Sequence, residues 1–215
     1  MKKTLIVLMM VLLAAMLFVS CDNKTKEPET KTYAIGDVGP AGGWIFYDCD
    51  ADNDSGNADG LTSATCGWRY LEIANEKEGI GEYCFGYYKT SSGYTTVGTS
   101  DAIGKGKENT EKLLVMGNAD KKAESGKESD EMEEYAAQKC RDYNGGGYTD
   151  WFLPSIKELQ AYFNSAVKDK LDYYKIFISS TEIDSDKAND LNYDGEISYS
   201  YRSSKKTVIP VRSFK

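Results

Sequence analysis

Four aspartates that alternate along one short segment are the residues best suited to hold a metal ion. They are Asp48, Asp50, Asp52 and Asp54. Hard cations such as Ca²⁺ bind several oxygen ligands on a flexible loop. Because alternate residues of an extended loop can point their carboxylates the same way, we take Asp50, Asp52 and Asp54 as candidate Ca²⁺ ligands. The segment lacks the sixth-position glycine and twelfth-position glutamate of an EF-hand, so a solvated acidic loop is the alternative.

A second segment matches the start of a calcium loop more closely. Asp190, Asn192 and Asp194-Gly195 have the spacing of the first ligands, but the twelfth position is Tyr201 and not glutamate. Apolar and polar residues alternate on both sides of Asp194-Gly195, and this dipeptide is a strong signal for a tight hairpin turn. We interpret the segment as a β-hairpin.

The cysteines indicate an exported protein. The chain has five, and we assign one of them, Cys21, to lipidation, as argued below. The other four are Cys49, Cys66, Cys84 and Cys140. An even number outside a reducing cytoplasm predicts up to two disulfides, and we favour the pairs Cys49–Cys66 and Cys84–Cys140. Buried thiols are the alternative, since cysteine is common in cores.

Several classes of chemistry are excluded or unsupported. The chain has no histidine, which rules out Ser-His-Asp and Cys-His catalysis and any metal site that needs imidazole. The segment Gly104-Lys105-Gly106-Lys107 lacks the spacing of a phosphate-binding P-loop. The carboxylates cannot be paired from sequence into the two that glycoside hydrolysis needs. We expect a protein that is not an enzyme and has no cofactor, except for a possible Ca²⁺ ion.

The overall charge limits the classes of molecule that the protein is expected to bind. Among 215 residues, 26 are Lys or Arg and 34 are Asp or Glu, which gives a net charge of −8. A nucleic-acid-binding protein needs a basic face to displace counterions, so we expect no nucleic-acid partner. The aromatic content of 12%, with 16 tyrosines, is too high for a disordered chain. The sequence therefore predicts a folded, acidic, tyrosine-rich domain.

The first 32 residues have the pattern of an export signal and a tether. Two lysines precede the apolar run Leu5–Val19, which is shorter than the ~20 residues of a membrane span and typical of a secretory signal. Residues 18–21, Phe-Val-Ser-Cys, are similar to a bacterial lipobox, in which Cys21 becomes lipidated. We therefore expect a signal peptide over 1–20, a lipidated Cys21 with a polar tether over 21–32, and one domain over 33–215. An uncleaved anchor helix and an unlipidated signal peptide are the alternatives.

Within residues 33–215 the predicted order is strands, helices, strands. Strands are predicted at 44–47, 68–73, 176–178, 190–201 and 206–214 by their apolar and alternating residues. Three helices are predicted. The first spans 110–116 and is closed by Gly117, the second begins after Ser129, and the third begins at the capping box Ser155–Glu158. Because no βαβ alternation appears, we expect an α+β fold with an antiparallel sheet, two or three flanking helices and long loops.

Five segments carry a resemblance to a known family. They are residues 39–47, 67–72, 98–110, 147–159 and 208–214. Together they resemble the Lcl C-terminal domain family, which includes the C-terminal domain of a bacterial collagen-like adhesin. The segments 151–159 and 208–214 are also similar to the C-type-lectin-like fold of sulfatase-modifying-factor domains. This chain differs from the adhesin in having no collagen-like stalk and in being acidic.

The resemblance implies a binding module of the cell envelope. Members of the family are exported, often as lipoproteins, and the adhesin implies binding to glycosaminoglycan or other surface ligands. We expect a membrane-anchored lipoprotein, on the periplasmic face or cell surface, that binds a glycan or host-matrix ligand. A structural lipoprotein without a small ligand and an enzyme related to sulfatase-modifying factors are the alternatives. Trp151 and Arg212 are candidate ligand contacts. Their alternative role is structural, with Arg212 paired to Glu158 or Asp150.

Overall fold

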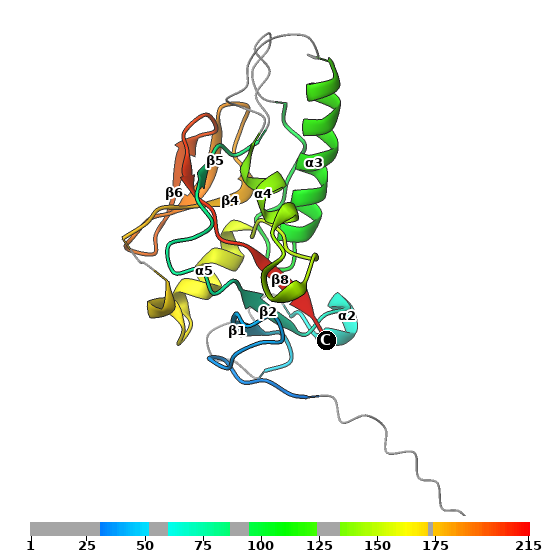
Figure 1. Ribbon diagram of the computed structural model, residues 1–215, viewed down its shortest axis with the longest axis vertical. Coiled ribbons are helices and arrows are strands. Elements are labelled where there is room, and N and C mark those ends of the chain that lie inside the picture. The colour runs from blue at the N-terminus through cyan, green and yellow to red at the C-terminus, as the bar shows by residue number, and fades with distance from the viewer. Residues whose placement is uncertain (1–30, 52–59, 87–94, 124–133, 172–173) are drawn as a thin grey trace, which may run out of the picture. The chain divides into compact units, whose positions relative to one another are not determined.

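A computed structural model describes residues 31–51, 60–86, 95–123, 134–171 and 174–215 (Figure 1). The chain divides into two units, Met1–Thr32 and Tyr33–Lys215. The second unit has an α+β fold, as the order of predicted elements indicates, and it contains two sheets.

The smaller sheet is antiparallel and joins the two ends of the unit. Its strands, in spatial order, are β1 (Trp44–Asp48), β2 (Tyr70–Ile73) and β8 (Val211–Phe214). β2 is central, and all four of its residues are buried. Glu72 of β2 lies opposite Arg212 of β8 in the register, which places a carboxylate beside a guanidinium inside the sheet.

The larger sheet has five strands in the order β3-β7-β4-β5-β6. They span Glu82–Tyr83, Lys206–Thr207, Phe177–Glu182, Lys187–Leu191 and Ile197–Tyr201, respectively. β4 and β7 are parallel, and the other pairs are antiparallel. β5 and β6 form the predicted hairpin around Asp194-Gly195.

The predicted antiparallel sheet is therefore only part of the fold, because there are two sheets and the larger one contains a parallel pair. Residues 206–214, which we predicted to be one strand, contribute β7 to one sheet and β8 to the other. Pro210 lies between them and cannot donate to a strand ladder, because proline has no backbone N–H. The chain crosses from sheet to sheet at this point.

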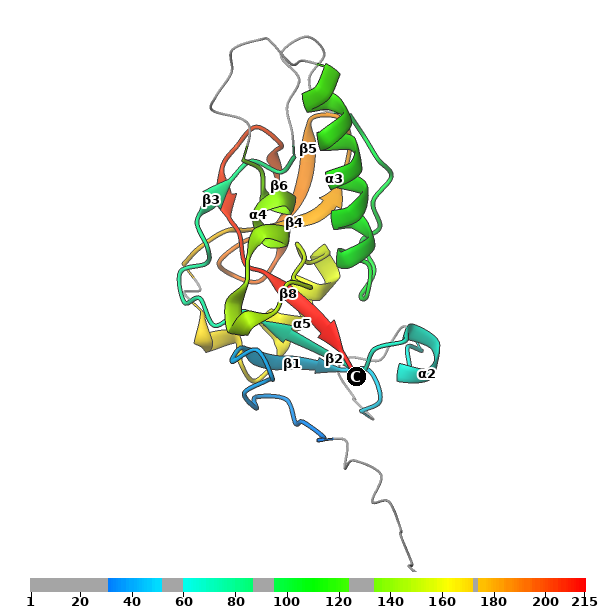
Figure 2. The same cartoon turned by 45° about the vertical axis from the view of Figure 1, so that its right-hand side comes forward.

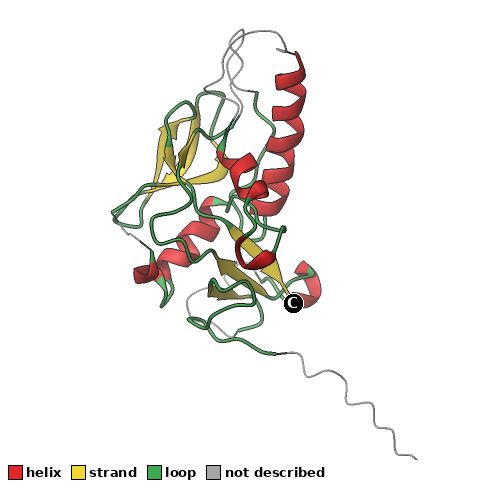
Figure 3. Ribbon diagram, viewed as in Figure 1, coloured by secondary structure: helices red, strands yellow, loops and turns green. Residues whose placement is uncertain are grey.

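Helices lie beside both sheets (Figures 2 and 3). They are α2 (Ser63–Cys66), α3 (Gly106–Ala123), α4 (Ala136–Asp142) and α5 (Ile156–Asn164), with 3₁₀ turns at Gly145–Gly147 and Lys168–Lys170. α5 contacts β1 of one sheet and β4 and β5 of the other. It begins with the predicted capping box, since the Ser155 hydroxyl accepts from the backbone N–H of Glu158 and the Glu158 carboxylate accepts from that of Ser155. No helix in the described ranges is long and apolar enough to cross a membrane.

One helix is longer than predicted. The sequence suggests that Gly117 ends a helix, but α3 continues through it to Ala123. A Cβ atom at this position would lie 2.3 Å from the Tyr135 hydroxyl. Gly117 therefore makes room for Tyr135, at the start of α4, and does not act as a cap. The helix predicted after Ser129 begins at Ala136, and residues 124–133 lie outside the described residues.

Candidate functional site

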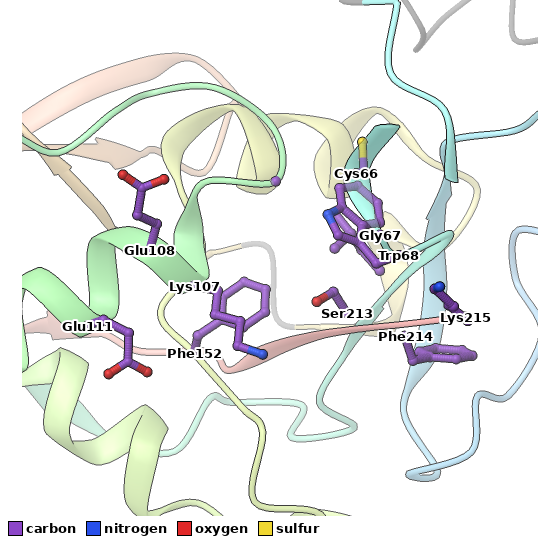
Figure 4. A pocket seen from close by; sticks show the side chains of 12 residues that line it. Cys66, Gly67, Trp68, Lys107, Glu108, Glu111, Phe152, Ser213, Phe214 and Lys215 are labelled. Atoms are coloured by element: carbon purple, nitrogen blue, oxygen red, sulfur yellow. The ribbon is translucent and has the colours of Figure 1, made fainter. Parts of the chain in front are cut away.

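An open pocket of about 560 Å³ lies where the start of α3, the end of α2 and the end of β8 meet (Figure 4). Its aromatic lining is Trp68, Phe152 and Phe214. Its polar lining includes Lys107, Glu108, Glu111, Ser213 and Lys215. The volume falls in the range of ligand-binding clefts, about 300–1,000 Å³.

Two glycines fix the position of the Trp68 indole. Gly67 ends α2 in the left-handed conformation, with φ of 78°, and turns the chain into Trp68. Gly104 lies against the indole, so that a Cβ atom there would come 2.9 Å from the Trp68 ring. The Tyr47 ring is also nearby, with 6.1 Å between ring centroids. The half-buried indole thus forms one side of the pocket on a packed support.

The start of α3, which carries Lys107 and Glu108, is held by a buried carboxylate. Glu158 accepts hydrogen bonds from the backbone N–H groups of Gly104 at 2.9 Å, Gly106 at 3.4 Å and Ser155 at 2.7 Å. Burial raises the pKa of Glu158 to about 7, although these hydrogen bonds to the carboxylate act in the opposite direction. A single side chain therefore joins the first turns of α3 and α5.

The carboxylates in the pocket are already paired with cations. Glu108 contacts Lys105 at 2.8 Å and Lys112 at 3.0 Å, and these hydrogen bonds lower the pKa of Glu108 to about 2. Glu111 pairs with Arg141. Lys107 has no ion-pair partner within the described part of the chain. The pocket therefore offers hydrogen-bond acceptors whose charge is balanced, and two ammonium groups, those of Lys107 and Lys215, for which the described residues provide no ion-pair partner.

The far side of the pocket depends on the ion pairs of Arg212. This guanidinium donates to both carboxylate oxygens of Asp150, at 2.9 and 3.0 Å, and to Glu72 at 3.0 Å. It lies 3.9 Å from the ring centroid of Tyr148. The next residues of β8, Ser213 and Phe214, line the pocket. The predicted pair of Arg212 with Asp150 is confirmed, whereas the alternative pair with Glu158 is wrong, because Glu158 caps the helices.

Trp151 and Arg212 lie in the interior, away from the pocket. Their exposed fractions are 1% and 3%. The Trp151 indole N–H donates to the backbone carbonyl of Gly145 at 3.2 Å. Because both side chains are committed to intramolecular contacts, a ligand could reach them only if the core opened. The geometry supports their structural role and not the predicted ligand contact.

The calcium candidates are only partly described. Asp50 accepts hydrogen bonds from the backbone N–H and the hydroxyl of Ser63, at 2.7 and 2.5 Å, at the start of α2. These bonds lower its pKa. Asp52 and Asp54 lie outside the described residues. Among the residues that the structure does describe, no group of three or more histidine, cysteine, aspartate or glutamate side chains could hold a metal ion.

The structure does not contain the disulfides that the cysteine count predicts. Cys49, Cys66, Cys84 and Cys140 are all thiols. The Cys49 thiol donates to the carbonyl of Trp68, and that of Cys84 to the carbonyl of Ser203, both at 3.2 Å. Cys140 packs in an apolar cluster, and burial raises its pKa well above the usual value. An even count shows that pairing is possible, but a bond also needs suitable geometry between the two cysteines.

Local sequence patterns contain little indication of the pocket. The apolar and alternating pattern predicts a half-buried strand that includes Trp68 and a last strand that includes Phe214, but it predicts no pocket between them. The residues come from segments more than a hundred positions apart, and only the pairing of β2 with β8 brings them together. The one local signal is the pair of glycines that position Trp68, namely Gly67, which precedes it, and Gly104, which packs against its ring.

Comparison with known proteins does not identify a family for this chain. No protein-family model matches this chain, and a search of curated proteins finds no match. The resemblance to the Lcl C-terminal domain family therefore stays a prediction from the residues that carry it.

Proposed function

We propose that this protein is a lipid-anchored lipoprotein of the bacterial cell envelope whose Tyr33–Lys215 unit binds a glycan. The pocket between α2, α3 and β8 is the proposed binding site. The observation that carries the proposal is the combination of aromatic walls with a polar rim in this open pocket (Figure 4). In this proposal the protein acts by binding, without catalysis and without a required cofactor.

The lining fits the chemistry of a sugar. A sugar ring has apolar C–H faces and a rim of hydroxyl groups, so it needs aromatic surface and hydrogen-bonding groups together. The aromatic surface is supplied by Trp68 and Phe214. The hydrogen-bonding groups are supplied by Lys107, Glu108 and Ser213. Because the carboxylates are balanced by Lys105, Lys112 and Arg141, they can accept hydrogen bonds from a neutral ligand without imposing a net negative charge.

We also propose a family and a fold for the Tyr33–Lys215 unit. We assign the unit to the Lcl C-terminal domain family with a C-type-lectin-like architecture. Two of the segments that carry the resemblance, 147–159 and 208–214, meet in the structure, where Phe152 bridges Val211 and Arg212 pairs with Asp150. These contacts support the view that the segments resemble the family because they build one structural unit.

The anchor gives a first test. We expect Cys21→Ala to prevent lipidation and to move the protein from the detergent phase to the aqueous phase on phase partitioning. The physical reason is that each buried CH₂ group contributes ~0.8 kcal/mol to membrane binding and stable anchoring takes two lipid signals. Cys66→Ala is the matched control and leaves the partitioning unchanged. Retention of Cys21→Ala in the detergent phase would show that the anchor proposal is wrong.

Glycan binding is tested with the full chain, purified in detergent, on a glycan array. We expect Trp68→Ala to weaken binding about 10- to 100-fold, since truncating a central aromatic residue of a binding site costs about 1–3 kcal/mol. Trp44→Ala is the control, because Trp44 is also half-buried but lies outside the pocket. Thermal melting of both variants separates lost binding from lost folding.

Each outcome of the array has a defined meaning. Binding that depends on Trp68 and not on Trp44 supports the pocket. Binding that is equal in both variants places the glycan elsewhere and rejects the pocket. No binding to any glycan favours the alternative of a structural lipoprotein, and turnover of a bound glycan favours an enzyme.

A further inference from the structure

Strand β6 forms one edge of the five-stranded sheet and presents an unusual number of exposed apolar side chains. It pairs with β5 on one side, and no described strand lies on the other side (Figure 1). Ile197, Tyr199 and Tyr201 are 44%, 57% and 60% exposed. Tyr193, in the preceding turn, is 53% exposed. Exposed apolar side chains grouped in this way mark interaction surfaces.

The backbone of β6 is also available on its outer side. The backbone N–H of Arg202 donates to the backbone carbonyl of Asp186 at 2.7 Å, and the backbone N–H of Asn192 donates to that of Glu196 at 3.1 Å. These bonds show that even-numbered residues of β6 face β5. In an antiparallel ladder the alternate residues direct their N–H and C=O groups to the other side. Ile197 and Tyr199 therefore direct both groups outward, and Tyr201 directs its N–H outward.

Nothing in β6 protects this edge. Edge strands of monomeric proteins are usually interrupted by charges, proline or a bulge, which prevent pairing with another chain. The residues of β6, Ile-Ser-Tyr-Ser-Tyr, contain no charge and no proline. Their pairing with β5 is regular over all five positions, from Lys187 with Tyr201 to Leu191 with Ile197.

We propose that β6 pairs with β6 of a second copy of this chain, in antiparallel orientation and around a two-fold axis. Tyr199 then faces Tyr199 of the second copy and exchanges both backbone hydrogen bonds with it. Ile197 faces Tyr201 of the second copy. The two five-stranded sheets join into one continuous sheet, and the same patch is used on both subunits, as a two-fold interface requires.

The charges at the ends of β6 complement each other in this orientation. Asp194 and Glu196 precede the strand and are exposed. At the other end, Lys205 follows the strand, and Lys187 lies across from Tyr201. An antiparallel pair places the acidic end of each strand beside the basic end of the other, whereas a parallel pair would place like charges together. Asp184 and Asp186 lie in the turn from β4 to β5, one strand further from the edge.

The first test is sedimentation of the full chain in detergent over a range of concentrations. We expect a monomer–dimer equilibrium, and we expect Tyr199→Lys to weaken it about tenfold or more, because two lysines would meet at the axis. Val115→Lys is the control, since Val115 is 69% exposed on α3. A chain that stays monomeric at all concentrations overturns the proposal, and so does a dimer that Tyr199→Lys leaves unchanged.

Charge reversal tests the orientation. Asp194→Lys and Lys205→Glu are each expected to weaken the dimer, because in this register Asp194 lies opposite Ser204 of the second copy, beside its Lys205, and each change places like charges together. The double variant is expected to restore dimerisation at least partly. This rescue would not occur if either residue acted only in the folding of its own subunit. Failure of the double variant to dimerise more strongly than both single variants contradicts the antiparallel pairing.

Discussion

Substitution of Arg212 by alanine is expected to lower the free energy of unfolding by about 3–5 kcal/mol, the usual loss when one member of a buried ion pair is removed. Glu72 is fully buried, and Arg212 is its cationic partner. The Glu72 carboxylate also accepts hydrogen bonds from the backbone N–H groups of Ala41 and Gly43, but these groups carry no charge. Without Arg212 the buried negative charge of Glu72 would therefore be uncompensated. Urea unfolding measures the loss. We expect Arg212→Lys to lose an intermediate amount, because lysine keeps the charge but not the two bonds to Asp150.

Arg69 provides a matched control. It also makes two hydrogen bonds to one carboxylate, that of Asp48, at 2.9 and 3.0 Å. Its side chain is 33% exposed, however, against 4% for Arg212. Solvent screens the Arg69 guanidinium, but its partner Asp48 is buried and would lose its cation, so Arg69→Ala is expected to cost about 1–3 kcal/mol, less than Arg212→Ala. Equal losses for the two arginines would contradict the central role of Arg212.

Glu158 is expected to make stability depend on pH between about 4.5 and 7. Burial raises its pKa from the ordinary value of 4.5 to about 7 in the folded protein. The protonated form is therefore favoured by folding, and the stability it contributes is complete below pH 4.5 and is lost as the pH rises through 7. A shift of this size corresponds to about 3 kcal/mol. Urea unfolding at a series of pH values measures it.

The contribution of Glu158 is isolated by comparing the wild type with Glu158→Gln. We expect the variant to be the less stable at pH 4.5, because the amide cannot accept from Gly104, Gly106 and Ser155 as the carboxyl group does. The difference is expected to shrink by about 3 kcal/mol by pH 8, where the wild type carries a buried charge. Glu108→Gln is the control, because the pKa of Glu108 is about 2 and its carboxyl group therefore does not titrate in this range. A constant difference between wild type and Glu158→Gln would refute the raised pKa.

Local patterns were sufficient for the elements whose signals lie within a few residues. The capping box of Ser155 and Glu158 predicted where α5 begins, because both of its hydrogen bonds are made within one turn. Asp194-Gly195 predicted the hairpin of β5 and β6, because a tight turn fixes the register of the strands beside it. The same reasoning failed at Gly117, where the deciding contact comes from Tyr135 of another helix.

The sequence by itself determined an α+β domain and its clearest helix and hairpin, and it limited the partner of Arg212 to Asp150 or Glu158, between which the structure chose Asp150. Only the tertiary structure decided that there are two sheets and that Trp68 and Phe214 share a pocket. It also showed that Glu158 caps α3 as well as its own helix. The physical reason is that helix caps and tight turns are set by neighbouring residues, whereas sheet partners and pocket walls depend on which distant segments can bury their apolar faces together.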